Sequence, residues 1–203
     1  MHALSKTLPA LLVLLLAGPL RADEAKPELL KVETQQVLKP FPMQAKRPHK
    51  GWRFVNLKKL KDSVRVRGRL PENYRDLHFQ LYVGASRGHV YVRGWKDMRE
   101  AKQAPSLALR VKAFVTALKK NFKDGGKLKK PRGVKAGRAA WVWFELQGEH
   151  IKTKAPHWLA CVVAYRPKTQ QVVTVLFEVP TREKKKLKRL RKDLKKLLAK
   201  LRW

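Results

Sequence analysis

This 203-residue sequence is short of cysteine and of long hydrophobic segments. Cys161 is the only cysteine, which excludes an intramolecular disulfide, and its apolar neighbours predict a small buried core residue. The apolar run from Leu8 to Leu20 covers 13 residues and contains two prolines. A membrane-spanning helix takes about 20 apolar residues, so this run is not expected to be a permanent anchor.

Acidic residues are also scarce, with 15 Asp and Glu in the whole sequence. General acid–base catalysis needs carboxylates held together in a pocket, and the nearest approach to such a pair, Asp97 and Glu100, is expected to lie in a solvated loop. The six histidines lack the four-residue helical spacing of a zinc site. We therefore expect exposed, unliganded histidines, no cofactor and no enzymatic activity.

The N-terminus has the pattern of an export signal. Lys6 precedes the apolar run, and Leu20-Arg21-Ala22 precedes the acidic pair Asp23-Glu24. We expect residues 1–22 to be cleaved as a signal peptide, which places the protein in the periplasm or outside the cell. The proline-containing residues 23–50 are predicted to be an extended lead-in segment.

Residues 51–203 have the pattern of one α+β domain. Strand signals cover residues 52–57, 63–69, 78–84 and 89–95, and later 138–147, 157–165 and 171–179. Between these two groups, a helical stripe is formed by Leu107, Val111, Phe114, Val115, Leu118 and Phe122. A terminal helix is predicted from about residue 181 to the end. The order ββββ-α-βββ-α predicts an antiparallel sheet of about six or seven strands flanked by helices.

Two short segments and the closing amphipathic helix resemble the PsbP-like α/β/α sandwich family. The segments are Gly51-Trp52-Arg53-Phe54 and Gly137-Arg138-Ala139-Ala140-Trp141, and the resemblance extends over roughly residues 50–203. That family includes a photosystem II accessory protein, a nuclear transport factor that binds a small GTPase, and exported bacterial proteins. The resemblance implies a non-enzymatic binding or accessory role, and it transfers no functional residue to this sequence.

One motif suggests a different class of function. Gly84-Ala85-Ser86-Arg87-Gly88 matches the G-x-S-x-G pattern of serine hydrolases, in which the serine lies on a sharp turn from a strand into a helix. Here the pattern is followed by the strand signal His89 to Arg93. A hairpin loop is therefore the favoured interpretation, and a hydrolase that uses Ser86 is the alternative.

Basic residues are the most abundant chemical feature, with 48 Lys and Arg and a formal net charge of +33. Such a charge attracts anionic polymers, anionic membrane surfaces and acidic proteins alike, or it serves solubility alone. The terminal helix has a narrow seam formed by Leu187, Leu190, Leu194, Leu197 and Leu201, with basic residues around it. The predicted anion-binding residues are Lys188, Arg191, Lys192, Lys195 and Lys196, together with Arg65 and Arg67 on a strand.

The sequence is also compatible with a second kind of partner. A protein–protein accessory role in the cell envelope, with the charge incidental, is the main alternative to an anionic partner.

Among the tryptophans, Trp141 and Trp143 share one strand face and are predicted to be core residues, whereas Trp52, Trp95 and Trp203 are expected to be more exposed. Trp203 would then be available as an anchor at a membrane surface.

Overall fold

The computed structural model describes residues 29–30, 34–37, 42–55, 74–83, 86–97, 104–137, 139–180 and 184–203. Its strands are β1 (Leu29–Leu30), β2 (Thr34–Val37), β3 (Met43–Lys46), β4 (Trp52–Val55), β5 (Tyr74–Val83), β6 (Ser86–Lys96), β7 (Lys127–Ala136), β8 (Ala139–Glu149), β9 (Pro156–Arg166) and β10 (Gln171–Val179). The helices are α2 (Leu107–Lys119), the short 3-10 helix η1 (Lys123–Gly125) and α3 (Lys184–Lys200).

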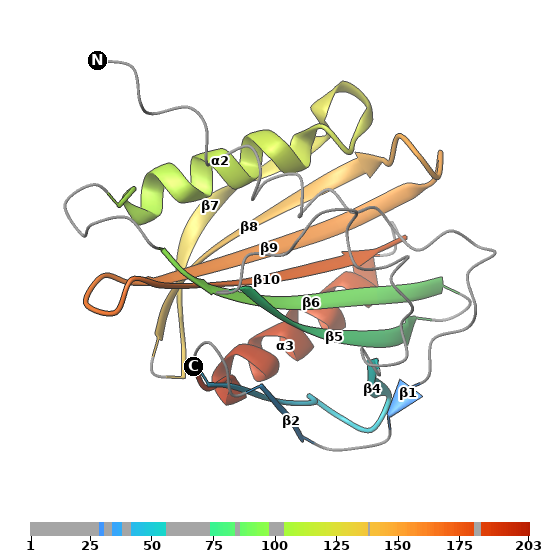
Figure 1. The fold of residues 1–203 in the computed structure, drawn as a ribbon. Coiled ribbons are helices and arrows are strands. Elements are labelled where there is room, and N and C mark those ends of the chain that lie inside the picture. The colour runs from blue at the N-terminus through green and yellow to red at the C-terminus, as the bar shows by residue number, and fades with distance from the viewer. Residues whose placement is uncertain are drawn as a thin grey trace, which may run out of the picture.

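Eight of these strands form one antiparallel sheet in the order β1-β4-β5-β6-β10-β9-β8-β7, and β2 pairs with β3 separately. Most neighbours in the sheet are consecutive in sequence, and the pairing of β6 with β10 joins the first half of the sheet to the second. Helices α2 and α3 lie on opposite faces (Figure 1). The predicted α+β class with an antiparallel sheet and two α-helices is confirmed.

The predicted strand count and order of elements are not confirmed. The sheet contains eight described strands instead of six or seven, and strand β7 was not predicted. The predicted strand at residues 63–69, with Arg65 and Arg67, lies outside the described residues, as does the expected signal peptide. The lead-in segment contains strands, and Met43 and Ala45 of β3 are buried in the core beside α3.

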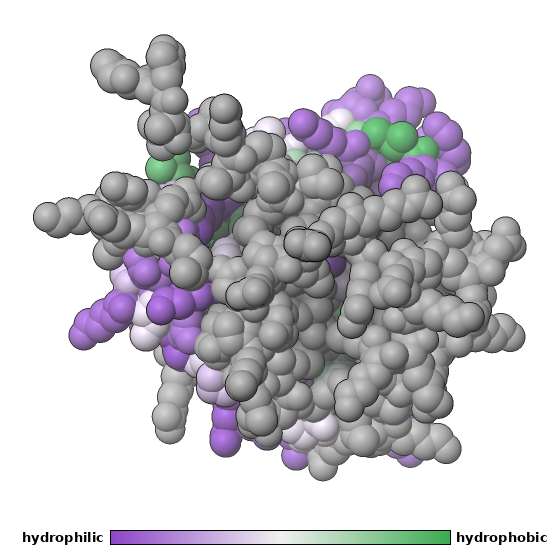
Figure 2. Space-filling view, in the orientation of Figure 1, coloured by the Kyte–Doolittle hydropathy of each residue, from purple (hydrophilic) through white to green (hydrophobic). Residues whose placement is uncertain are grey.

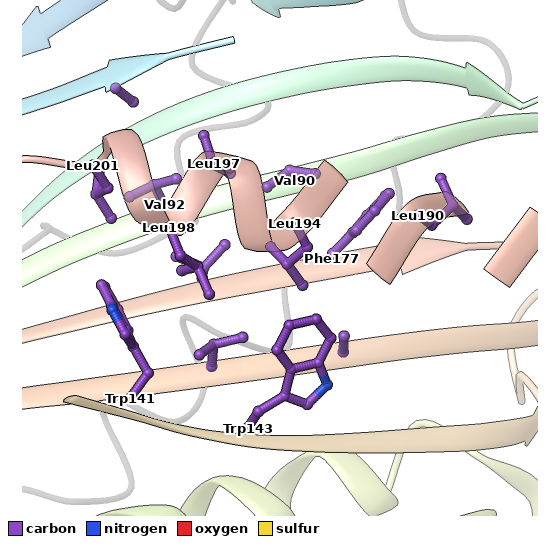
Figure 3. Close-up of a cluster of buried hydrophobic side chains, with 14 of the residues drawn as sticks. Val90, Val92, Trp141, Trp143, Phe177, Leu190, Leu194, Leu197, Leu198 and Leu201 are labelled. Atoms are coloured by element: carbon purple, nitrogen blue, oxygen red, sulfur yellow. The ribbon is translucent and has the colours of Figure 1, made fainter. Parts of the chain in front are cut away.

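Helix α3 packs its leucine seam onto the sheet. Leu187, Leu190, Leu194, Leu197, Leu198 and Leu201 are all buried. Figure 3 shows several of these leucines among Val90, Val92 and Phe177, with Trp141 and Trp143 below them. The predicted seam and the predicted core positions of the two strand tryptophans are therefore confirmed. The helix ends at Lys200, slightly earlier than expected, because Arg202 then forms an isolated β-bridge with Gln44.

The opposite core is formed by α2 and the other face of the central strands. Val111, Phe114, Leu118 and Phe122 are buried there, and Leu107 and Val115 pack against them, as the helical stripe predicts. Ser106 caps the helix by accepting a hydrogen bond from the Leu109 amide at 3.3 Å. Because β9 and β10 lie between the two cores, both of their faces are covered, which explains their continuous apolar sequences.

The expectation that Trp52 and Trp95 are exposed was wrong. Trp52 is buried in the α3-side core and Trp95 in the α2-side core. Trp203 is half-buried, with its ring centroid 5.9 Å from that of Trp141. The guanidinium of Arg166 lies over the Trp203 ring, 4.1 Å from its centroid, and donates a hydrogen bond to the Trp203 carbonyl. Trp52, Trp95 and Trp203 thus lie near the ends of strands or of the chain and pack at the edges of the two cores.

Candidate functional site

The outer face of α3 is a strongly basic surface, and it carries several of the predicted anion-binding residues. The helix contains ten basic residues and one acidic residue, Asp193. The leucine seam is turned to the sheet, and the side chains on the opposite side are exposed, among them those of Lys185, Lys188, Arg189, Lys192, Lys195, Lys196 and Lys200. Four predicted anion-binding lysines therefore lie together on a solvated face.

Asp193 does not reduce the charge of that face. It is buried on the side of α3 that is turned towards the segment after β3, and its Oδ2 is 3.1 Å from His49 Nε2. The solvated side of α3 consequently has no acidic residue of its own. Lysines four residues apart repel each other and destabilise an isolated helix, so this helix depends on its packing against the sheet.

Arg191 occupies a different position from the four lysines. Its Nε donates a hydrogen bond to Glu145 Oε1 at 2.8 Å, and its Nη2 donates to Glu145 Oε2 at 2.5 Å. The Arg191 side chain is 28% exposed, whereas that of Glu145 on β8 is almost completely buried. Arg191 therefore ties α3 to the sheet, and much of its charge is neutralised within the protein.

The Glu145 carboxylate also accepts hydrogen bonds from two indoles. Trp143 Nε1 lies 3.1 Å from Oε1, and Trp158 Nε1 lies 3.0 Å from Oε2. Burial alone would raise the pKa of Glu145. The hydrogen bonds from Arg191 and Trp158 and the positive charge of Arg191 outweigh this effect and hold the pKa below its ordinary value of 4.5. This carboxylate is charged and fully paired, which is typical of a structural ion pair.

The edge strand β7 provides a second group of basic side chains. Lys127, Lys129, Lys130, Arg132 and Lys135 are all exposed, and β7 contains no acidic residue. Lysines on an edge strand prevent pairing with another molecule, and Pro131 and the bulge between Lys129 and Arg132 have the same effect. This group was not predicted because the sequence of β7 shows no strand pattern.

Two histidines that were expected to be exposed are buried at the ends of β8 and β9. The rings of His150 and His157 stack with centroids 4.8 Å apart. His157 Nδ1 lies 2.9 Å from Glu178 Oε1, and His157 Nε2 lies 3.0 Å from Thr153 Oγ1. Burial lowers the pKa of His150 below its ordinary 6.5; Glu178 opposes this effect, and His157 and Lys152 add to it. The contacts fix the β8–β9 turn.

Other sequence-predicted candidates are structural or differ from expectation. Asp97 is buried and paired with Arg110 of α2 at 2.5 Å, instead of lying in a solvated loop, and Glu100 lies outside the described residues. Ser86 begins β6 and pairs with Val83 of β5, so the chain runs from strand to strand at this position. The strand-to-helix turn of a nucleophile elbow is not formed there, and the hairpin interpretation is confirmed.

Cys161 is buried and free, as predicted, and burial raises the pKa of its thiol. Within the described ranges, no group of three or more His, Cys, Asp or Glu side chains is placed to hold a metal ion. Neither α-helix among the described residues is long and apolar enough to cross a membrane.

The surface visible in Figure 2 is mostly hydrophilic in its described part. A small hydrophobic patch lies near the turn that joins β8 and β9. Ile151 in that turn is 44% exposed, and Leu109 on α2 is 60% exposed. These are the exposed large hydrophobic residues of the described ranges, and neither belongs to α3.

Neither a family model nor a curated protein matches the chain. Among solved structures, the chain is similar to LpqN of Mycobacterium tuberculosis, a protein involved in cell envelope biogenesis. The two share 9% identity with a TM-score of 0.41, over 66% of this chain and 79% of that chain. A TM-score this low identifies neither a fold family nor a function, and the resemblance to the PsbP-like family stays a prediction.

Proposed function

We propose that this chain is an exported, non-enzymatic accessory protein that binds an anionic partner through the outer face of α3. The observation that carries the proposal is the separation of charge on this helix. Its exposed side chains include Lys188, Lys192, Lys195 and Lys196, whereas its one acidic residue is buried and paired with His49. A bound anion would therefore face several cations and no competing carboxylate from the helix.

The packing of α3 makes this face a fixed array instead of a flexible tail. Five buried leucines of α3 and Leu201 directly after it hold the helix on the sheet, and Arg191 anchors it to Glu145 on β8. The helix backbone fixes the spacing of these lysines, so movement of their flexible side chains relieves only part of their repulsion. A polyanion relieves it by neutralising several of them at once and releasing its own counterions, so binding is expected to weaken steeply with salt.

The test replaces Lys188, Lys192, Lys195 and Lys196 together by Gln. All four side chains are exposed, so the thermal midpoint of unfolding should stay within a few degrees of the wild type. We expect binding to heparin, measured by isothermal titration calorimetry at several salt concentrations, to weaken by at least about tenfold at low salt, with a shallower dependence on salt.

A matched control carries the same loss of charge on the opposite side of the sheet or in the β8–β9 turn. Lys112, Lys120, Lys123 and Lys152 are exposed there, and their replacement by Gln should change binding by no more than about twofold. Full retention of binding by the α3 variant would overturn the proposal. Equal losses in both variants would show that net charge alone governs binding, and binding that ignores salt would favour the protein–protein alternative.

A further inference from the structure

We infer that the anionic partner is an acidic polysaccharide that lies across both α3 and the edge strand β7. This inference rests on the proposed function, because it names the class of partner and enlarges the surface that contacts it. It depends on three features of the described residues: the closeness of β7 to α3, the bulge that redirects Arg132, and the lack of exposed large apolar side chains on α3.

The second half of β7 lies beside α3. Val134 and Ala136 pack against the core cluster that contains the α3 leucines. At Gly137, in the turn after β7, an added Cβ atom would lie 3.1 Å from the Ala199 carbonyl oxygen. The backbone of this turn therefore touches the C-terminal end of α3, and the basic side chains of the two elements border one surface.

The bulge in β7 places Arg132 on the α3 side of the sheet. In a regular strand Leu128 and Val134 would share a face, because side chains alternate with a period of two. Instead, Leu128 packs on the α2-side core and Val134 on the α3-side core. The register shift between Lys129 and Arg132 accounts for this change of face.

Arg132 on β7 and Arg191 on α3 contact two buried side chains that are hydrogen-bonded to each other, Trp143 and Glu145. The Arg132 guanidinium carbon lies 5.9 Å from the ring centroid of Trp143, whose Nε1 donates to the carboxylate that Arg191 binds. Arg191 is largely neutralised by Glu145, whereas exposed Arg132 forms no ion pair with any described residue. Lys188 and Lys195 lie three and four residues from Arg191, on the same side of the helix. A band of cations thus runs from α3 to β7.

A lipid surface fits this band less well than a polymer does. Helices that lie on membranes insert apolar side chains between lipids. The α3 leucines are all used in the core, and Trp203 packs against Trp141 and Arg166. The exposed Leu109 and Ile151 belong to α2 and to the β8–β9 turn. The surface offers charge without an apolar anchor.

The same reasoning separates a polysaccharide from single-stranded nucleic acid. Proteins that bind single strands stack successive bases on exposed aromatic rings. The rings near the cation band, those of Trp141, Trp143 and Trp158, are buried. Side chains that carry charge without exposed rings fit a chain recognised by repeated sulfate or carboxylate groups. An exported protein would meet such a chain at or outside the cell envelope.

The test is a β7 variant in which Lys129, Lys130 and Arg132 are replaced by Gln, with Lys112, Lys120 and Lys123 replaced by Gln as the matched control. We expect heparin and polygalacturonate, which carry sulfate and carboxylate groups respectively, to bind the β7 variant at least about fivefold more weakly than the wild type at low salt. The control should bind within about twofold of the wild type. Circular dichroism and thermal unfolding check that both variants fold.

The outcomes distinguish this inference from the proposed function. If the α3 variant binds weakly and the β7 variant binds as the wild type does, the two-element site is overturned and the proposed function stands. If neither variant loses binding, both are overturned. If vesicles that contain phosphatidylglycerol, or a single-stranded oligonucleotide, bind more tightly than both polysaccharides at equal salt, the class of partner is wrong.

Discussion

Glu145 shows how a single buried charge organises this protein. Glu145 belongs to β8, and its side chain lies on the face of the sheet that α3 covers. Its two carboxylate oxygens accept four hydrogen bonds from two indoles and one guanidinium. A buried carboxylate with all of these partners is tolerated, whereas one that loses its cation is costly. The pair formed with Arg191 therefore adds a specific contact between β8 and α3 to the packing of the leucine seam.

This role predicts the behaviour of Arg191 when it is changed to Met. The variant leaves a buried carboxylate without its cation, so the free energy of unfolding at pH 7 should fall by about 3 kcal/mol. The partial exposure of Arg191 keeps the loss at the lower end of the range for buried pairs. Urea unfolding followed by tryptophan fluorescence measures the loss, and Lys192→Met is a control with an expected change below about 0.5 kcal/mol.

The pH dependence of that loss gives a second check on the same variant. In the wild type the lowered pKa of Glu145 contributes stability above the ordinary value of 4.5, and this contribution is lost as the pH falls through the lowered value. In the variant the unpaired carboxylate gains stability on protonation. The difference between the two proteins should therefore shrink on acidification from pH 7 to pH 4. A constant difference would show that Arg191 acts by packing alone.

The position of Arg191 also shows what the sequence does not reveal about single residues. Arg191, Lys188 and Lys195 look alike as basic positions beside a leucine seam, and all three were predicted to bind an anion. The distinction depends on Glu145, which lies 46 residues away in sequence on β8. The burial of Asp97, His150 and His157 was missed for the same reason, because their partners come from other elements.

The apolar periodicities of α2 and α3 were predicted correctly because each helix packs one continuous stripe on a sheet face. Strand β7 was missed because its sequence, with five basic residues, one proline and one glycine, has neither an apolar stripe nor alternation. Its pairing with β8 and its place at the sheet edge make it a strand. Similarly, β3 is too short and polar to recognise, and only the packing of Met43 and Ala45 reveals its core role.

The apolar stripe on α2 predicts which of its side chains contribute most to the free energy of unfolding. Phe114 is buried, with its ring centroid 6.3 Å from that of Trp95. Its replacement by Ala removes a large apolar side chain and leaves a cavity, so the free energy of unfolding should fall by about 3–5 kcal/mol. Leu109→Ala, at an exposed position of the same helix, should change it by less than about 0.5 kcal/mol. Similar losses in the two variants would contradict the assigned helix face.

For the molecule as a whole, the net charge has a consequence for stability that does not depend on the identity of the partner. With 48 basic and 15 acidic residues, most lysines cannot find a carboxylate, and like-charge repulsion opposes the compact state. Among the described residues, ion pairs between arginine and a carboxylate join α3 to β8 and α2 to the end of β6, and histidines lie beside Asp193 and Glu178. The outer face of α3 and strand β7 are left with unbalanced positive charge.

Salt should therefore stabilise this protein. Ions screen repulsion between exposed charges, with a screening length that falls from about 30 Å at 0.01 M to about 10 Å at 0.1 M. We expect the thermal midpoint of unfolding, measured by differential scanning fluorimetry, to rise by several degrees between 0.01 M and 0.2 M sodium chloride. The variant with Lys188, Lys192, Lys195 and Lys196 changed to Gln should show a smaller rise, because part of the repulsion is already removed. A midpoint that falls with salt would show that attractive ion pairs dominate, and that the basic face of α3 stores no repulsion for an anionic partner to relieve.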